Sequence, residues 1–547
     1  MPELILGPVL RYVDETDATI WVETDGPAEI EVLGCTSRTF HVAGHWYALV
    51  HVRDLEPGTS TEYEVRVDGE LRWPQPDSEF PASVIRTPAD HTPAKIVFGS
   101  CRVSAPHEPP YALTKDEDDC GREVDALFAM ARRMIEQPCE EWPHRLLMLG
   151  DQVYADEVSP EALEFIKSRR SIEEPPGEEV ADFEEYTRLY WESWAEPVMR
   201  WLLSTIATAM IFDDHDVHDD WNISASWLED YRAKPWWDDR IRGAFMSYWV
   251  YQHIGNLSPD ELHEDEMYDK VCACDDATDM LAEFAYKADR EIEGTRWSYS
   301  RDYGGVRVVM IDSRAGRDFE DGRRCMIDDD EWTWIEEHLV GGHDHLIIGT
   351  SLPLLLGPGL HYLEAWNEAI CNGAWGRFGD LIGEKIRRGL DLEHWAAFGE
   401  SFERLTRRIQ EVGAGKHGRA PASIVILSGD VHHAYLAEVA FRRGTGVESA
   451  VYQAVCSPFR NPLSTKEKNT VRFATSRAGH LVGRALAKSA GVEDPDLRWR
   501  FVHGPYFDNQ IATLVLHDRD AHLCLERTVP EEWREPQLHE CLSRRLA

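Results

Sequence analysis

Three short apolar runs in this chain each end in acidic residues, and this pattern constrains the fold more than any other sequence feature. The runs RLLMLG, ATAMIF and SIVILS lead into GDQVYADE (150–157), DDHD (213–216) and SGDVHH (428–433). A short apolar run that ends in Gly-Asp or Asp-Asp is typical of a buried strand that delivers carboxylates at its carboxyl end. Carboxylates crowded there repel each other unless cations lie between them, and a pair of metal ions is the simplest solution.

The first 88 residues differ from the rest and predict a separate all-β domain. Apolar and polar residues alternate in 18–25, 29–34, 47–52 and 61–69, and turn residues separate these segments. Short strands at this spacing indicate a small antiparallel β-sandwich, of immunoglobulin or fibronectin type. The Pro-rich stretch 73–94 indicates a linker, which we place at 89–94.

Residues 95–530 alternate between apolar strands and helices, which indicates a mixed α/β catalytic domain. The expected strands are 95–100, 145–150, 208–214, 306–312, 345–351, 423–430, 451–455 and 511–517. Helices are expected at 121–137 and 399–412, the second with Phe402, Leu405 and Ile409 at helical spacing. Two acidic, Trp-rich stretches, 156–200 and 222–300, are predicted to be helical insertions over the site, and 531–547 is expected to be a tail.

Charge and composition narrow the function. The 547 residues include 57 Lys and Arg against 99 Asp and Glu, a net charge of -42. We interpret this negative charge as a solvated acidic surface. The electrostatic field of such a surface repels long nucleic acids. A small anionic substrate stays compatible, because bound metal can reverse the local field.

We expect a cytoplasmic protein without a membrane span. The N-terminus MPELILGPVL lacks the regions of a signal peptide, and no apolar run approaches the roughly 20 residues that cross a bilayer. The 11 cysteines show no paired pattern except Cys272 and Cys274, which suits reduced thiols.

The first two acidic motifs offer metal ligands and an acid. In GDQVYADE, Asp151 and Tyr154 can meet at one ion, and a phenolate oxygen suits a trivalent metal such as Fe³⁺. The alternative is an ordinary loop with a core tyrosine. In DDHD, Asp214 can bind a metal while His215 faces the substrate as a general acid or phosphate contact. The alternative is an acidic loop on an acidic protein.

The third motif and the first strand of the α/β domain supply the remaining candidate metal ligands. Asp430 and His432 are two residues apart, so on a strand that continues outward both would project to one side. His433 would face the other way, where a packing role explains it equally well. Cys101 ends the first strand beside Arg102, and it is either a small buried side chain or a thiolate ligand.

The order of these motifs resembles the calcineurin-like metallophosphoesterases, and within them the PhoD-type alkaline phosphatases, which are related to purple acid phosphatases. The resemblance covers the whole architecture, from the N-terminal β-sandwich through residues 95–530. It implies an α/β fold in which a metallophosphatase-type β-sandwich is flanked by helices. It also implies a binuclear centre of Fe³⁺ and a divalent ion.

The resemblance implies a role for individual residues at the Fe³⁺ ion of this centre, which we call the iron side. The aspartate of GDxxY that bridges the two metals corresponds to Asp151, and the tyrosine that binds iron corresponds to Tyr154. The cysteine that joins the iron shell in PhoD-type enzymes corresponds to Cys101, and the GHxH motif, which reads GDVH here, adds His432.

The second ion is expected at Asp214, which stands at the asparagine of the superfamily's GNHE motif, and at Asp430. The superfamily also has a histidine after a middle strand, whereas GTSLP (349–353) has none here. The second ion would then be bound by oxygen ligands and water only. Because Ca²⁺ prefers oxygen ligands, we expect Ca²⁺ there, with Mg²⁺, Mn²⁺ or Zn²⁺ as alternatives.

Two arginines are candidates to neutralise phosphate oxygens. Arg314 lies in IDSR (311–314) just after a strand, and Arg102 follows Cys101. A salt bridge is the alternative for each arginine. His394 replaces the aspartate of a family Asp-Trp pair.

We therefore expect metal-assisted hydrolysis of a small phosphate ester, monoester or diester, with the ions roughly 3.5–4 Å apart and a metal-activated water as nucleophile. His215 would steady or protonate the leaving oxygen. The alternatives are a phospholipase D-like phosphodiesterase on the same metals and a catalytically silent metal-binding protein.

Overall fold

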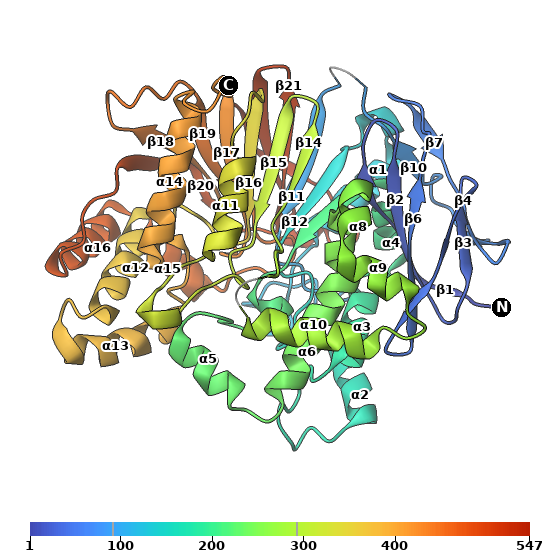
Figure 1. The fold of residues 1–547 in the computed structure, drawn as a ribbon. Helices are drawn as coiled ribbons and strands as arrows, with labels where there is room; N and C mark the ends of the chain where they lie inside the picture. The colour runs from blue at the N-terminus through green and yellow to red at the C-terminus, as the bar shows by residue number, and fades with distance from the viewer. Residues whose placement is uncertain (90–91, 292–293) are drawn as a thin grey trace.

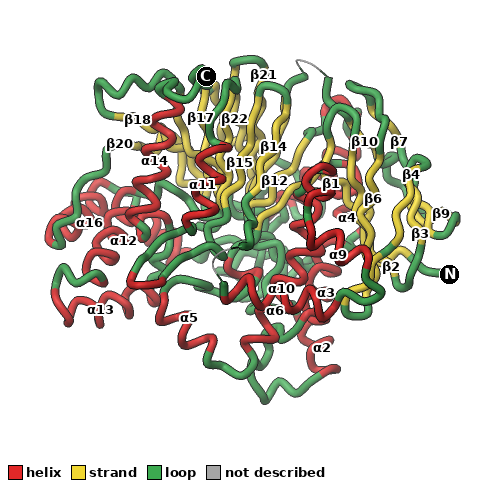
Figure 2. Tube along the Cα trace, viewed as in Figure 1, coloured by secondary structure: helices red, strands yellow, loops and turns green. Residues whose placement is uncertain are grey.

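The protein has a mixed α/β fold with an all-β N-terminal region, as the sequence predicts (Figures 1 and 2). The structure is a computed structural model that describes residues 1–89, 92–291 and 294–547. In these ranges no helix is both long enough and apolar enough to cross a bilayer. Residues 90 and 91 of the expected linker lie outside the described residues.

The N-terminal region contains three small sheets around one core. The first is β1(Leu4–Val13), β2(Ala18–Thr24), β6(His45–Val52) and β5(Phe40–Val42). The second is β4(Cys35–Arg38), β3(Glu29–Val32), β8(Val65–Val67) and β9(Glu70–Trp73). The third pairs β10(Val84–Arg86) with β7(Ser60–Glu62). Buried side chains such as Ile20, Val50 and Val65 fill the space between the first two sheets.

Two large sheets form the α/β domain. The six-stranded sheet has the order β13(Ala207–Ile211), β12(Arg145–Leu149), β11(Ala94–Gly99), β21(Gln510–His517), β22(Asp520–Arg527) and β23(His539–Arg545). The seven-stranded sheet has the order β14(Tyr299–Tyr303), β15(Val306–Ile311), β16(His345–Thr350), β17(Ser423–Ser428), β19(Ala450–Val455), β18(Ala434–Phe441) and β20(Leu497–Tyr506). All eight strands expected between residues 95 and 517 are present. The expected tail 531–547 contains β23, so this segment extends a sheet.

The near-continuous apolar strands follow from burial on both faces of the seven-stranded sheet. Val308 and Met310 of β15 belong to the core shared with the six-stranded sheet. Val309 and Ile311 belong to a second core on the opposite face, because successive side chains alternate. Helices α11(Asp329–His338) and α14(Gly399–Gly413) cover that second face, for instance with Leu405.

Helices also form the predicted insertions. The stretch 156–200 contains α2(Pro160–Arg169), α3(Phe183–Trp194) and the start of α4(Pro197–Thr205). The stretch 222–300 contains α5(Ala225–Arg232), α6(Trp237–Ser247), α7(Ile254–Asn256), α8(Pro259–Glu264), α9(Glu266–Ala273) and α10(Thr278–Arg290). Helix α1(Ala126–Glu136) packs near α4, and a lobe at the left of Figure 1 contains α12(Pro358–Cys371), α13(Gly376–Gly389), α15(Thr465–Ala474) and α16(Arg477–Ser489).

A buried arginine of the N-terminal region makes hydrogen bonds to the α/β domain. Arg11 of β1 donates hydrogen bonds to the carbonyl oxygens of Thr208, Tyr251 and Gln252 at 2.9, 2.6 and 2.7 Å. It also contacts the Asn256 side-chain oxygen at 3.1 Å. These bonds are buried and join residues from both regions, so the two regions share a buried interface.

Candidate metal centre

The loops that carry the acidic motifs meet because their strands are parallel. β11, β12 and β13 are parallel neighbours, so the loops after them leave the same edge of the six-stranded sheet. These loops carry Cys101, Asp151 and Asp214, in that order. Asp430 and His432 follow β17 of the other sheet and reach the same place.

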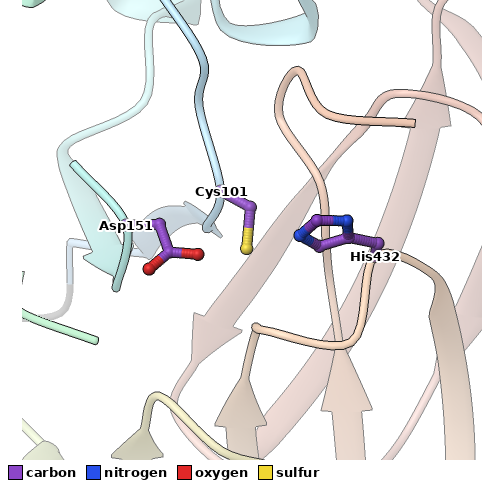
Figure 3. A group of neighbouring side chains, drawn as sticks. All are labelled: Cys101, Asp151 and His432. Carbon is purple, nitrogen blue, oxygen red and sulfur yellow. The ribbon is translucent and has the colours of Figure 1, made fainter. Parts of the chain in front are cut away.

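The predicted iron side is assembled from three of these loops. Ligand atoms of Cys101, Asp151 and His432 all lie within 4.8 Å of one another, and the three side chains point toward a common centre (Figure 3). The Tyr154 hydroxyl is 3.4 Å from the second Asp151 carboxylate oxygen. The structure thus brings together the four residues expected on this side.

The predicted second side adjoins the first through a shared carboxylate. Asp151 forms a further group with Asp214 and His215, and Asp214 forms another with Asp213 and Asp430, each within 4.8 Å. Asp151 therefore belongs to both the cysteine-containing group and the aspartate–histidine group. A bridging ligand between two ions must occupy such a position.

Four of the predicted ligands adopt strained backbone conformations. Cys101, Asp151, Asp430 and His432 have φ angles of 55°, 50°, 64° and 49°, in the left-handed region that non-glycine residues rarely adopt. Such strain clusters at functional sites, where surrounding structure enforces it. The expectation that Asp430 and His432 lie on a continuing strand is wrong, because β17 ends at Ser428 and both residues lie in the loop after it.

Glycine at two positions permits these turns. Gly150 has a φ of 113°, and a Cβ there would be 2.6 Å from the Asp213 Cβ. A Cβ on Gly429 would overlap the Ser100 hydroxyl oxygen. Close approach of the loops at the strand ends therefore requires glycine at both positions.

The carboxylates offer unmatched oxygen atoms to a cation. Considering the described residues, Asp151 Oδ1 and Asp213 Oδ2 are buried without a hydrogen-bond partner. Burial raises the pKa of Asp151, and the carboxylates of Asp213 and Asp214 raise it further. Buried carboxylates in this state are stabilised by a cation, so the residues present fit a metal centre.

The sulfur and nitrogen donors fit the same conclusion. Burial raises the pKa of the Cys101 thiol, and Asp151 and Asp430 add to the rise, so a thiolate there requires a cation. Burial lowers the pKa of His432 to about 4, and Lys115 contributes to the shift. His432 is therefore neutral at physiological pH, the form that binds metal.

His215 is held by a residue that the sequence analysis did not single out. Its Nδ1 atom lies 2.9 and 3.0 Å from the two Asp156 carboxylate oxygens. Burial disfavours the imidazolium, but Asp156, Asp214 and Asp151 outweigh it and raise the pKa of His215. Asp156 lies inside GDQVYADE, yet its sequence position does not show that it reaches a histidine 59 residues away.

Asp430 is held by His394. His394 Nε2 is 3.0 Å from Asp430 Oδ2, and its Nδ1 is 2.7 Å from the buried Glu364. Burial would raise the pKa of Asp430, but His394 and Arg314 together with His432 outweigh it and lower that pKa. The substitution of the family aspartate by His394 thus places a cationic partner beside a predicted metal ligand.

Both predicted phosphate-binding arginines contact protein carboxylates. Arg314 is fully buried and pairs with Asp213, with Glu393 and, at 3.1 Å, with Asp214. Arg102 is buried and pairs with Asp125 at 2.8 Å. These geometries favour the salt-bridge interpretation of both arginines.

A lysine outside the predicted set reaches the iron side. Lys115 Nζ is 3.3 Å from the Asn461 side-chain oxygen, and Asn461 Nδ2 donates to the Tyr154 hydroxyl at 3.2 Å. No motif marks Lys115, since it lies in a loop 346 residues from Asn461. Where the superfamily has a histidine, Ser351 donates to Asp213 Oδ1 at 3.0 Å.

Comparison with known proteins agrees with the fold. The chain resembles the solved structure of PhoD, with a TM-score of 0.59 and 11% sequence identity, over 100% of this chain and 92% of the other. This likeness shows the fold. No curated protein sequence matches the chain.

The family profiles complete the assignment. Residues 1–85 match a domain of unknown function, DUF7800, and residues 120–499 match the PhoD-like phosphatases. The fold and these matches place the protein among the phosphatases. More specifically, the chain belongs to the PhoD-like phosphatase family, because that profile covers more than half of its length.

Proposed function

We propose that the protein hydrolyses phosphate esters at a binuclear centre of Fe³⁺ and a divalent ion, with Ca²⁺ as the favoured second metal. The shared position of Asp151 in two adjoining ligand groups carries this proposal. Cys101, Tyr154 and His432 would hold iron beside Asp151, and Asp214 and Asp430 would hold the second ion. When bound, the ions would supply Lewis-acid chemistry by polarising a phosphoryl oxygen and acidifying a water.

In this proposal His215 would act on the leaving group. Because Asp156 accepts a hydrogen bond from Nδ1, the proton available for transfer is on Nε2. General acid catalysis from such a position contributes about 10²–10⁴-fold to the rate. The Tyr154 ring, with its centroid 4.8 Å from that of His215, helps to fix the imidazole plane.

Lys115 replaces the two arginines as the candidate contact for substrate phosphate. Arg314 and Arg102 are occupied by buried carboxylates, whereas Lys115 is held by an amide oxygen that carries no charge. An ammonium group near Tyr154 would attract a phosphate oxygen and fix its orientation.

Asp151→Asn tests the proposal directly. The wild-type protein, loaded with iron and calcium, should cleave p-nitrophenyl phosphate or bis(p-nitrophenyl) phosphate. Asp151→Asn should lose both bound iron and activity, whereas Asp302→Asn, which alters a surface pair with Arg307, should retain them. Activity that survives in Asp151→Asn would disprove the bridging role.

The substrate panel separates the alternatives. Faster turnover of the diester than of the monoester would favour the phosphodiesterase interpretation, including a phospholipase D-like activity. Stoichiometric metal without turnover of any ester would instead support a catalytically silent metal-binding protein.

A further inference from the structure

The lobe of α12, α13, α15 and α16 contains most of the exposed large apolar side chains in the described part of the chain. Five of twelve lie in these helices and two more flank α13, among them Trp375, Leu381, Phe473, Leu481 and Val482. Phe473 is 56% exposed and Leu481 is 69% exposed. Exposed apolar side chains gathered in one region indicate an interaction surface.

Helix α16 packs Leu486 against a small core in this lobe but turns Leu481 and Val482 away from the protein. Its buried side consists of Gly479, Gly483 and Ala487. A Cβ on Gly483 would overlap the backbone of Gly359 in α12, so the two helices cross in close contact. The crossing leaves no room for larger side chains on the inner face, and Leu481 lies on the outer face. Packing within this chain therefore does not account for the exposed residues.

Helices α15 and α16 form a basic segment in an acidic protein. Residues 465–489 contain six lysines and arginines against one glutamate, in a chain with a net charge of -42. Lys466, Arg472, Arg477, Arg484 and Lys488 are exposed. We call the exposed basic and apolar residues of α15 and α16 the α15–α16 surface.

A groove rich in arginine adjoins the α15–α16 surface. It has a volume of about 810 Å³, and Arg442, Arg443, Arg484 and Arg498 line it. Asp494 and Asp496 also line the groove and pair with Arg484 and Arg442. Arg443 and Arg498 remain without an acidic partner among the residues that line the groove, so the groove has a net positive charge. Such a groove can bind an anionic group.

We propose that the α15–α16 surface docks on an anionic lipid bilayer. Basic residues beside exposed Leu, Val and Phe are the combination that binds a charged interface and enters its apolar layer. A symmetric dimer through this surface would bring like charges together. Nucleic acid would use the charges but not Leu481 and Val482.

Docking would bring the candidate metal centre to the lipid head groups. The backbone amide of Thr465, the first residue of α15, is 3.4 Å from an Asp116 carboxylate oxygen. Asp116 adjoins Lys115, whose amide partner Asn461 contacts Tyr154. The lipid proposal goes beyond the proposed function, because binding is measured without turnover.

Vesicle flotation with the full chain tests the proposal. Wild-type protein should float with phosphatidylglycerol-containing vesicles and not with pure phosphatidylcholine vesicles, and added salt should release it. One basic residue contributes roughly fivefold to partition onto an anionic surface, so Lys466→Glu with Arg477→Glu should lower binding at least about 25-fold. Leu481→Gln with Val482→Gln should also lower it, while Leu71→Gln, at an apolar position 42% exposed in the N-terminal region, should not.

Several results would overturn the proposal. Wild-type protein that stays unbound on phosphatidylglycerol vesicles would refute it, as would surface variants that bind like wild type. A dimer in analytical ultracentrifugation that Leu481→Gln with Val482→Gln dissociates, without vesicle binding, would assign the surface to a second copy. Binding of a short duplex oligonucleotide in place of vesicles would assign it to nucleic acid. In each case hydrolysis of p-nitrophenyl phosphate reports the proposed function separately.

Discussion

Replacing Arg314 by methionine distinguishes a structural arginine from a substrate-binding one. Its guanidinium is fully buried, pairs with Asp213 and Glu393, and lies 3.1 Å from Asp214 and 3.5 Å from Asp430. Removing one partner of a buried ion pair costs about 3–5 kcal/mol, because the remaining charge stays buried without compensation. We expect a loss of that size in the free energy of unfolding.

The assay is urea unfolding of the chelator-treated protein, followed by tryptophan fluorescence. Chelation is needed because bound cations would themselves neutralise the carboxylates. Arg307→Met is the matched control, since Arg307 pairs with Asp302 at the surface, where such a pair contributes at most about 1 kcal/mol. If Arg314→Met instead unfolds like wild type and raises KM for a phosphate ester, the arginine binds substrate and the structural argument fails.

Three further predictions follow from other contacts. Asp156→Asn should lower kcat by about 10²–10⁴-fold, and by more for phenyl phosphate than for p-nitrophenyl phosphate, whose leaving group needs less protonation; equal losses on both would contradict the role of His215. Lys115→Met should raise KM about tenfold without altering iron content, Lys115→Arg should restore it, and an unchanged KM would remove Lys115 from the substrate site. His45 contacts Glu23 and Glu184 at 2.8 and 2.9 Å; burial opposes its charge, but both carboxylates outweigh it and raise its pKa from 6.5 to about 9. Its stabilisation is thus complete below pH 6.5 and lost as pH rises through about 9, so His45→Gln should cost about 1–3 kcal/mol at about pH 6 and less at about pH 9.5 in urea titrations, and a cost independent of pH would contradict this.

The sequence alone determined the strands of the α/β domain and indicated candidate metal ligands. Apolar runs such as 306–312 and 423–430 became β15 and β17, because strands buried on both faces must be apolar throughout. The candidate ligands Cys101 and Asp151 follow such runs at one edge of the six-stranded sheet, whereas the candidate ligand Asp430 follows β17 of the other sheet. The resemblance of the motifs then indicated the phosphatase family before any packing was known.

Only the tertiary structure decided the partners of these residues. The role of Arg314 depends on Asp213, which lies 101 residues away, and His215 depends on Asp156, 59 residues away. Sequence periodicity records which face a residue occupies, but it does not record which distant side chain shares that face. The net charge of -42 likewise describes the whole chain and does not show where basic residues gather on the surface. The fold alone gathers the basic residues of α15 and α16 beside exposed apolar ones, because helix crossing at Gly359 and Gly483 turns that face outward.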